Sequence, residues 1–161
     1  MAKETKCCTS PEVLKKISEY AAQYKGRQDM LLEVLHTAQK AAGNYLPEDV
    51  IVAVATAMDL PIAKVYTVVE FYAFFSTKPR GEHIIRMCTN APGHVRYASD
   101  TLKRFEQVLG IQAGETTPDG KFTLEKCSCM GLCDCEPAIM IDETVYGPVY
   151  PEDVRGIVEK Y

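Results

Sequence analysis

The sequence predicts a chain in two parts, a helical bundle followed by a small α/β layer. Through residues 10–75, apolar side chains recur at steps of three and four, which is the period of a helix with one buried face. Beyond residue 82, short apolar runs and turn residues follow the order strand, helix, three strands, helix. At 161 residues and 47% hydrophobic content, the chain is long enough for a small helical unit and a compact α/β domain.

Four helices are expected in the first part. Ser10 and Pro11 offer a capping hydroxyl and a proline suited to a first helical turn, and Gly43 is a stop signal for the second helix. Pro47 and Pro61 stand where two further helices begin. The expected helices cover about 11–24, 31–41, 47–58 and 61–75.

The loop-like stretch from Ser76 to Gly81 is the natural boundary between the parts. We therefore expect a tail over 1–9, a helical bundle over 10–79 and an α/β domain over 80–161. In the second domain the expected strands cover 83–87, 121–124, 138–141 and 144–146, and the expected helices cover 97–109 and 151–160.

The net charge and the lack of a long apolar segment exclude several classes of partner and location. Eighteen Lys and Arg against 22 Asp and Glu give a net charge of -4, which provides no broad basic face for nucleic acid or anionic lipid. The N-terminus is polar, and no apolar run reaches the length of a signal peptide or membrane span. We expect a cytoplasmic protein without direct membrane insertion.

Seven cysteines are unusual for such a chain, and four of them fall between Cys127 and Cys135. Their odd number and their clustering favour metal or redox chemistry over structural disulfides. Cys7 and Cys8 lie in the polar tail and receive no role.

The string from Cys127 to Cys135, together with Cys88 at the end of an expected strand, supplies five candidate thiolate ligands. Thiolates bind iron–sulfur clusters or zinc, and four complete either site. The separated C-x2-C pairs typical of structural zinc are absent, so zinc is the minor alternative. Cys129 and Cys133 flank Gly131 in a C-x3-C spacing that a tight turn can bring together.

Several further strings stand in order along the chain from about Leu31 to Tyr161. They are Tyr45-Leu46-Pro47-Glu48, Glu70-Phe71-Tyr72, Arg86-Met87-Cys88-Thr89, His94-Val95-Arg96, the run from Asp119 to Glu125, Cys129-Met130-Gly131-Leu132-Cys133, and the run from Pro137 to Ile141. In order and spacing they resemble the thioredoxin-like [2Fe-2S] subunit of respiratory complex I, of soluble NAD-linked or electron-bifurcating hydrogenases, and of NAD-linked formate dehydrogenases.

The resemblance implies a thioredoxin-like C-terminal domain, with a small central sheet and flanking helices, and a [2Fe-2S] cluster that transfers electrons. It implies a flavoprotein partner that binds FMN and NAD(P)(H), and a further catalytic subunit. The chain itself has no G-x-G-x-x-G or G-x-x-x-x-G-K-[ST] motif and no paired carboxylates. We therefore expect no nucleotide site and no catalytic residue on this subunit of an oxidoreductase.

The ligand pattern of the family, a C-x4-C pair and a C-x3-C pair, falls here on Cys88, position 93, Cys129 and Cys133. Position 93 is glycine, so one expected thiolate is missing.

Three side chains are candidates to replace that thiolate. Cys135 is favoured because it follows the Gly131 turn in a segment whose loop geometry is adjustable, and Cys127 is the second candidate. His94 ranks below both, because the resemblance places a histidine there beside a full cysteine set. His36 and His83 are isolated and have weaker claims.

Other functions stay open. A structural subunit that has lost its cluster would explain Gly93. An independent ferredoxin would leave the helical half without a use, and a thiol–disulfide oxidoreductase would need a C-x-x-C pair, which is absent. The aromatic side chains of Tyr66, Phe71, Tyr72, Phe74 and Phe75 are expected in a core or an interface.

Overall fold

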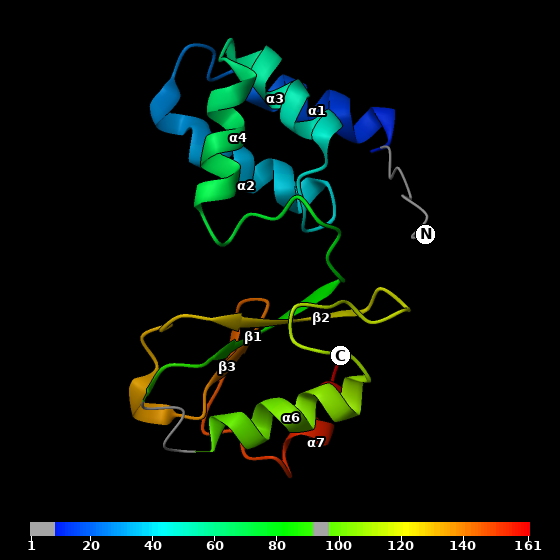
Figure 1. The fold of residues 1–161 in the computed structure, drawn as a ribbon. Coiled ribbons are helices and arrows are strands. Elements are labelled where there is room, and N and C mark those ends of the chain that lie inside the picture. Colours follow the sequence, from blue (N-terminus) through cyan, green and yellow to red (C-terminus); the bar gives the residue numbers. More distant parts are fainter. Residues whose placement is uncertain (1–8, 92–96) are drawn as a thin grey trace. The chain divides into compact units, whose positions relative to one another are not determined.

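The computed structural model describes residues 9–91 and 97–161, which divide into two compact units at Pro79 and Arg80 (Figure 1). Each unit has its own hydrophobic core, and the two sets of core residues do not overlap. Within the described ranges, no helix combines the length and apolar character needed to cross a bilayer.

The first unit is helical. Its elements are α1 (Pro11–Ala22), a short 3-10 turn η1 (Gln28–Met30), α2 (Leu31–Ala41), α3 (Glu48–Met58) and α4 (Ile62–Phe71). α1 lies along α3, and both appear side by side in Figure 1. Val34, Leu35, Val54 and Val65 are fully buried between the helices, as their helical spacing predicts.

Gln39 connects α2 to the last residues of the first unit through two hydrogen bonds. Its side-chain amide donates to the carbonyl oxygen of Phe74 at 3.0 Å, and its oxygen accepts from the amide of Ser76 at 3.0 Å. Because Gln39 is buried, these two bonds satisfy polar groups that would otherwise be costly to bury.

In its described residues, the second unit has a four-stranded mixed sheet and two α-helices. The strands are β1 (His83–Cys88), β2 (Phe122–Cys127), β3 (Ile139–Ile141) and β4 (Thr144–Tyr146), in the spatial order β2-β1-β3-β4. β1 and β2 run parallel and are connected through α6 (Ala98–Leu109), whereas β3 is antiparallel to both β1 and β4. A 3-10 turn η2 (Cys133–Cys135) precedes β3, and α7 (Val154–Val158) follows β4.

Side chains along each strand alternate between a core face and a second face of the sheet. Ile85 and Met87 of β1 are fully buried in the core with Phe105 of α6 and Ile157 of α7. α6 and α7 therefore cover the same face of the sheet, as Figure 1 shows. Cys88 is an odd number of residues from Ile85 and Met87 and lies on the other face.

Four elements, α1, α4, α7 and β2, end or begin two or more residues away from the sequence expectations. Ser10 precedes α1 but makes no side-chain capping bond, and α1 ends at Ala22. α4 ends at Phe71, because Tyr72 adopts an extended conformation. α7 spans five residues, since Pro151 to Asp153 form turns before it. β2 continues to Cys127, where its last residues pair with β1.

The expected aromatic side chains divide between core and surface. Phe75 is buried in the helical core, and Phe74 packs on it with ring centroids 4.6 Å apart. Phe71 is 77% exposed, so it lies outside the core, and an interface stays the prediction for this residue.

Candidate metal centre

Cys88 is the last residue of β1, and the parallel register brings it next to Cys127, the last residue of β2. Directly paired residues of adjacent strands project to the same face, so the two cysteines lie together at the edge where both strands end. Cys88 is 1% exposed, and burial raises the pKa of its thiol, while a hydrogen bond from the Asn90 amide opposes the shift. Burial likewise raises the pKa of Cys127 to about 11.

The loop after β2 turns sharply at Gly131, whose φ of 80° lies in the left-handed region that glycine adopts without strain. This turn places the sulfur atoms of Cys129 and Cys133 3.4 Å apart, and both residues are exposed. Two thiolates on one tetrahedral metal with bonds of about 2.3 Å would be about 3.8 Å apart. The sulfur pair is therefore spaced for two ligands of one metal atom.

Hydrogen bonds make the two thiols of this loop unequal. The Gly131 amide donates to the Cys129 sulfur at 3.3 Å, which lowers the pKa of Cys129, and a hydrogen bond from Cys133 lowers it further. Donating to Cys129 raises the pKa of Cys133. Of these two thiols, Cys129 is thus the one with the lower pKa.

Electrostatic effects connect Cys88 to the loop pair. Charge on Cys129 raises the pKa of Cys88, and charge on Cys88 raises that of Cys133. Among the described residues, no three ligand side chains converge on a single point as a mononuclear site requires. A two-iron cluster distributes its ligands over two metal atoms, which suits one close pair and a third thiol nearby.

Of the other proposed ligands, Cys127 lies beside Cys88 at the end of β2, and Cys135 ends η2. The sulfur of Cys135 lies 3.5 Å from the carbonyl oxygen of Leu132, and it packs so close to Gly147 that a Cβ there would lie 2.9 Å from it. Gly93 and His94, like Cys7 and Cys8, lie outside the described residues.

The remaining histidines have other partners. His36 stacks on Phe74 with ring centroids 5.0 Å apart. His83 begins β1, at the opposite end from Cys88, and its Nδ1 lies 2.8 Å from Asp142 Oδ2. The place of His83 at the far end of β1 agrees with its weak claim as a ligand.

The sequence reasoning missed Glu136. It is 2% exposed, and its Oε2 accepts a hydrogen bond from the Ala138 amide at 3.0 Å. Its Oε1 is buried and has no hydrogen-bond partner of normal geometry among the described residues. The sequence shows only an acidic residue after Cys135, because burial of a carboxylate cannot be read from a polar, cysteine-rich string.

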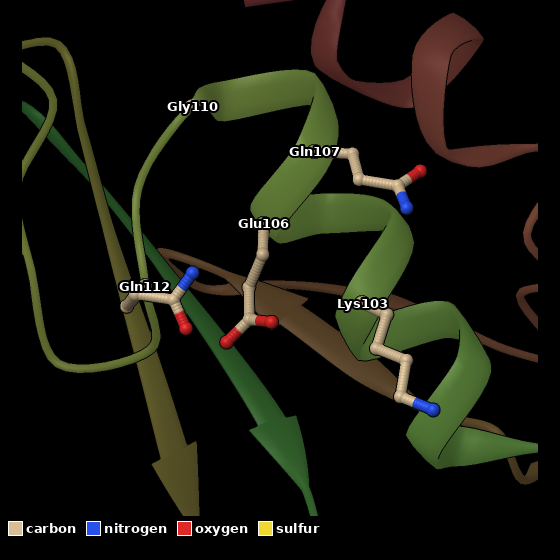
Figure 2. A pocket seen from close by; sticks show the side chains of 5 residues that line it. All are labelled: Lys103, Glu106, Gln107, Gly110 and Gln112. Atoms are coloured by element: carbon tan, nitrogen blue, oxygen red, sulfur yellow. The ribbon is translucent and has the colours of Figure 1, made fainter.

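Two surface hollows lie elsewhere. One, of about 400 Å³, is lined by the C-terminal half of α6 and by Gln112, and Figure 2 shows that Glu106 and Gln112 point toward each other there. Glu106 Oε1 accepts from the Ala113 amide at 3.1 Å, so this carboxylate serves the local backbone. The other, of about 480 Å³, lies between α1 and α3. Neither is lined by cysteine or histidine.

The sequence pattern of the thioredoxin-like [2Fe-2S] ferredoxins matches residues 17–161, a range that includes Cys88, Cys129 and Cys133. The chain belongs to this ferredoxin family. The match confirms the resemblance, the thioredoxin-like fold class and the iron–sulfur character of the family.

Curated relatives of this ferredoxin-family chain are subunits of oxidoreductases. The HndA subunit of the NADP-reducing hydrogenase of Solidesulfovibrio fructosivorans is 36% identical over 147 residues, which are 91% of this chain and 85% of the relative. One subunit of the NADH-quinone oxidoreductase of Rickettsia bellii is 34% identical, over 84% of this chain and 81% of the relative. Its counterpart in Pseudomonas aeruginosa is 34% identical, over 86% and 82%.

A solved structure supports the fold of this ferredoxin-family chain. The NAD+-reducing [NiFe]-hydrogenase in its H2-reduced state superimposes with a TM-score of 0.73 and 23% identity over 86% of this chain. The match covers 22% of the hydrogenase chain, so this protein corresponds to one part of a longer polypeptide there.

Proposed function

We propose that this chain is an electron-transfer subunit whose second unit binds a [2Fe-2S] cluster. The observation that carries the proposal is the sulfur pair of Cys129 and Cys133, 3.4 Å apart, with the buried Cys88 as its electrostatic neighbour. These three thiols occupy three of the four ligand positions of the family pattern.

When bound, such a cluster accepts and releases single electrons. The residues of this chain would hold it and set its potential. Cys88, at the buried end of β1, keeps water from one side, and the Gly131 amide donates to the Cys129 sulfur. Hydrogen bonds to cluster sulfurs and solvent exposure are the protein's main means of adjusting the potential.

The partner subunits follow from the relatives. Since HndA and its counterparts in the NADH-quinone oxidoreductases are components of larger enzymes, we propose that this chain also works in a multi-subunit complex. A flavoprotein subunit would bind FMN and NAD(P)(H), and a further subunit would carry the second substrate reaction. The lack of a nucleotide-binding motif in this chain supports that division of labour. A reducing cytoplasm suits its unpaired thiols.

The deciding experiment is EPR spectroscopy of the reduced protein, purified without oxygen, with analysis of iron and acid-labile sulfide. Electron transfer predicts a rhombic two-iron signal, with iron and sulfide in stoichiometric amounts. Cys129→Ser should abolish or alter that signal.

The second candidate function is a structural role in the complex for a chain that has lost its cluster. The glycine at position 93 favours it, because the family pattern requires a thiolate there. A folded chain that binds its flavoprotein partner but contains no iron, even after anaerobic reconstitution, would establish this function and exclude electron transfer.

A further inference from the structure

We propose that the carboxylate of Glu136 is the fourth ligand of the cluster, in place of the thiolate that is missing at position 93. This inference rests on the proposed function, because it presupposes that a two-iron cluster is bound. It assigns the position to a residue that the cysteine pattern does not contain.

The burial of Glu136 is the first argument. The side chain is 2% exposed, and only Oε2 has a normal hydrogen bond, to the Ala138 amide. Oε1 is buried without such a partner in the described part of the chain. Buried charges in proteins are paired or coordinate metals, since an uncompensated one is costly. A metal atom at Oε1 would supply the missing compensation.

The position of Glu136 among the cysteines is the second argument. A hydrogen bond joins its carboxylate to the buried Cys88. Glu136 also follows η2 (Cys133–Cys135) directly in the chain, between the cysteine loop and β3. It is thus in contact with one proposed ligand and close in sequence to another.

The competing thiols do not need a metal to account for their positions. Cys135 directs its sulfur to the Leu132 carbonyl and packs against Gly147. Cys127 lies beside Cys88 and is half-buried, and a thiol packs in such surroundings as a small apolar side chain. The buried Oε1 of Glu136 lacks a hydrogen bond of normal geometry among the described residues, which favours Glu136 over both cysteines.

The chemistry allows the assignment. Carboxylates are established iron ligands, and in Rieske centres one iron of a two-iron cluster carries two non-thiolate ligands. Ligation forms one bond from iron to Oε1 in place of a bond from iron to a solvent oxygen. No electron is transferred in this exchange.

The test compares variants of the full chain, purified without oxygen and reconstituted with iron and sulfide. Glu136→Gln keeps the size of the side chain and an acceptor for the Ala138 amide but removes the anionic ligand. We expect its iron content to fall at least threefold, or its EPR g-values and visible absorption to change. Asp134→Asn, an exposed carboxylate two residues away, is the matched control and should leave iron and spectra unchanged.

Two further variants separate ligation from a general effect on folding. Glu136→Cys should keep the iron and give the spectrum of an all-thiolate cluster. Gly93→Cys combined with Glu136→Gln should restore the iron, because a thiolate then occupies the position that the family pattern provides. The metal-free Glu136→Gln protein should melt no lower than the metal-free wild type, since it buries one charge less.

The outcomes distinguish the inference from the function on which it rests. Wild-type iron and spectra in Glu136→Gln, with loss of iron in Cys127→Ser or Cys135→Ser, would overturn the ligand assignment and leave the function intact. Absence of iron from the reconstituted wild type would overturn both. Loss of iron in Glu136→Gln that neither Glu136→Cys nor the Gly93→Cys double variant reverses would also overturn the assignment.

Discussion

At the scale of single residues, burial decides how strongly an ion pair contributes to the stability of the second unit. Glu125 accepts from Arg80 Nε at 2.7 Å and lies 3.5 Å from Arg86 Nε. The Arg80 side chain is 6% exposed and that of Glu125 is 22% exposed, so this carboxylate compensates a guanidinium that is almost out of water. The burial lowers the pKa of Arg80, and the charge of Glu125 opposes that shift.

We expect Glu125→Gln to lower the free energy of unfolding by about 2 to 3 kcal/mol, slightly less than the loss of one partner costs a fully buried pair. Urea unfolding followed by circular dichroism measures the change. Glu159→Gln is the matched control, because Glu159 and Arg155 form an exposed pair at 3.3 Å, and such pairs contribute about 0.5 kcal/mol or less. Equal losses in the two variants would contradict this argument.

Asp119 gives a prediction about pH. Its side chain accepts hydrogen bonds from the Thr117 hydroxyl and the Lys121 amide, and the bond from Thr117 is the main cause of its lowered pKa. A lowered pKa in the folded state stabilises the fold above the pH at which the unfolded group titrates, and the contribution is lost as the pH falls through the folded pKa. The difference in melting temperature between wild type and Asp119→Asn should therefore shrink from about pH 6 to about pH 2. A constant difference would exclude the charge of Asp119 as its source.

At the scale of elements, the cysteine loop depends on a glycine in a neighbouring segment. A Cβ at Gly147 would lie 2.5 Å from the carbonyl oxygen of Cys135, which is closer than real Cβ atoms approach backbone. Gly156 in α7 has open space at the same position.

We expect Gly147→Ala to cost about 1 to 3 kcal/mol of stability, as overpacking does, because the Cys135 backbone must move. Gly156→Ala should instead stabilise the chain by about 0.5 to 1 kcal/mol, since alanine favours a helix interior. Thermal unfolding of the two variants distinguishes these effects. An unchanged stability of the Gly147→Ala variant would mean that the cysteine loop can move without a loss of free energy.

Sequence reasoning succeeded for elements whose apolar pattern is long and failed where tertiary contacts decide. The apolar spacing of α2 and α6 predicts both helices to within a residue or two. The polar end of β2 could not be predicted, because Glu125 belongs to the strand through its register with Arg86 of β1. The sequence shows five candidate thiols, and the family resemblance implies Cys88, Cys129 and Cys133 as ligands, an assignment that stays a prediction. Glu136 could not be singled out from the sequence, since its burial arises from the packing of the loop.

At the scale of the whole molecule, the two separate cores predict that each unit folds alone. We expect a fragment of residues 80–161 to give a dispersed NMR spectrum and a cooperative thermal transition, because its sheet and both helices bury one continuous core. A fragment of residues 1–79 should keep its helical circular dichroism for the same reason. A fragment 80–161 with the narrow amide dispersion of an unfolded chain would show that its stability depends on the helical unit.

The unequal exposure of the three thiols has a consequence for the side of the cluster at which electrons enter and leave. Cys88 is enclosed at the end of β1, whereas Cys129 and Cys133 face solvent. A cluster held by them would be covered by protein on one side and exposed to solvent on the other. Electrons tunnel most efficiently over short distances, so the redox group of a partner would exchange them fastest from above the Cys129 and Cys133 loop. The same exposed side, at Cys129 and Cys133, would be the first to react with oxygen whenever the chain is separated from its complex.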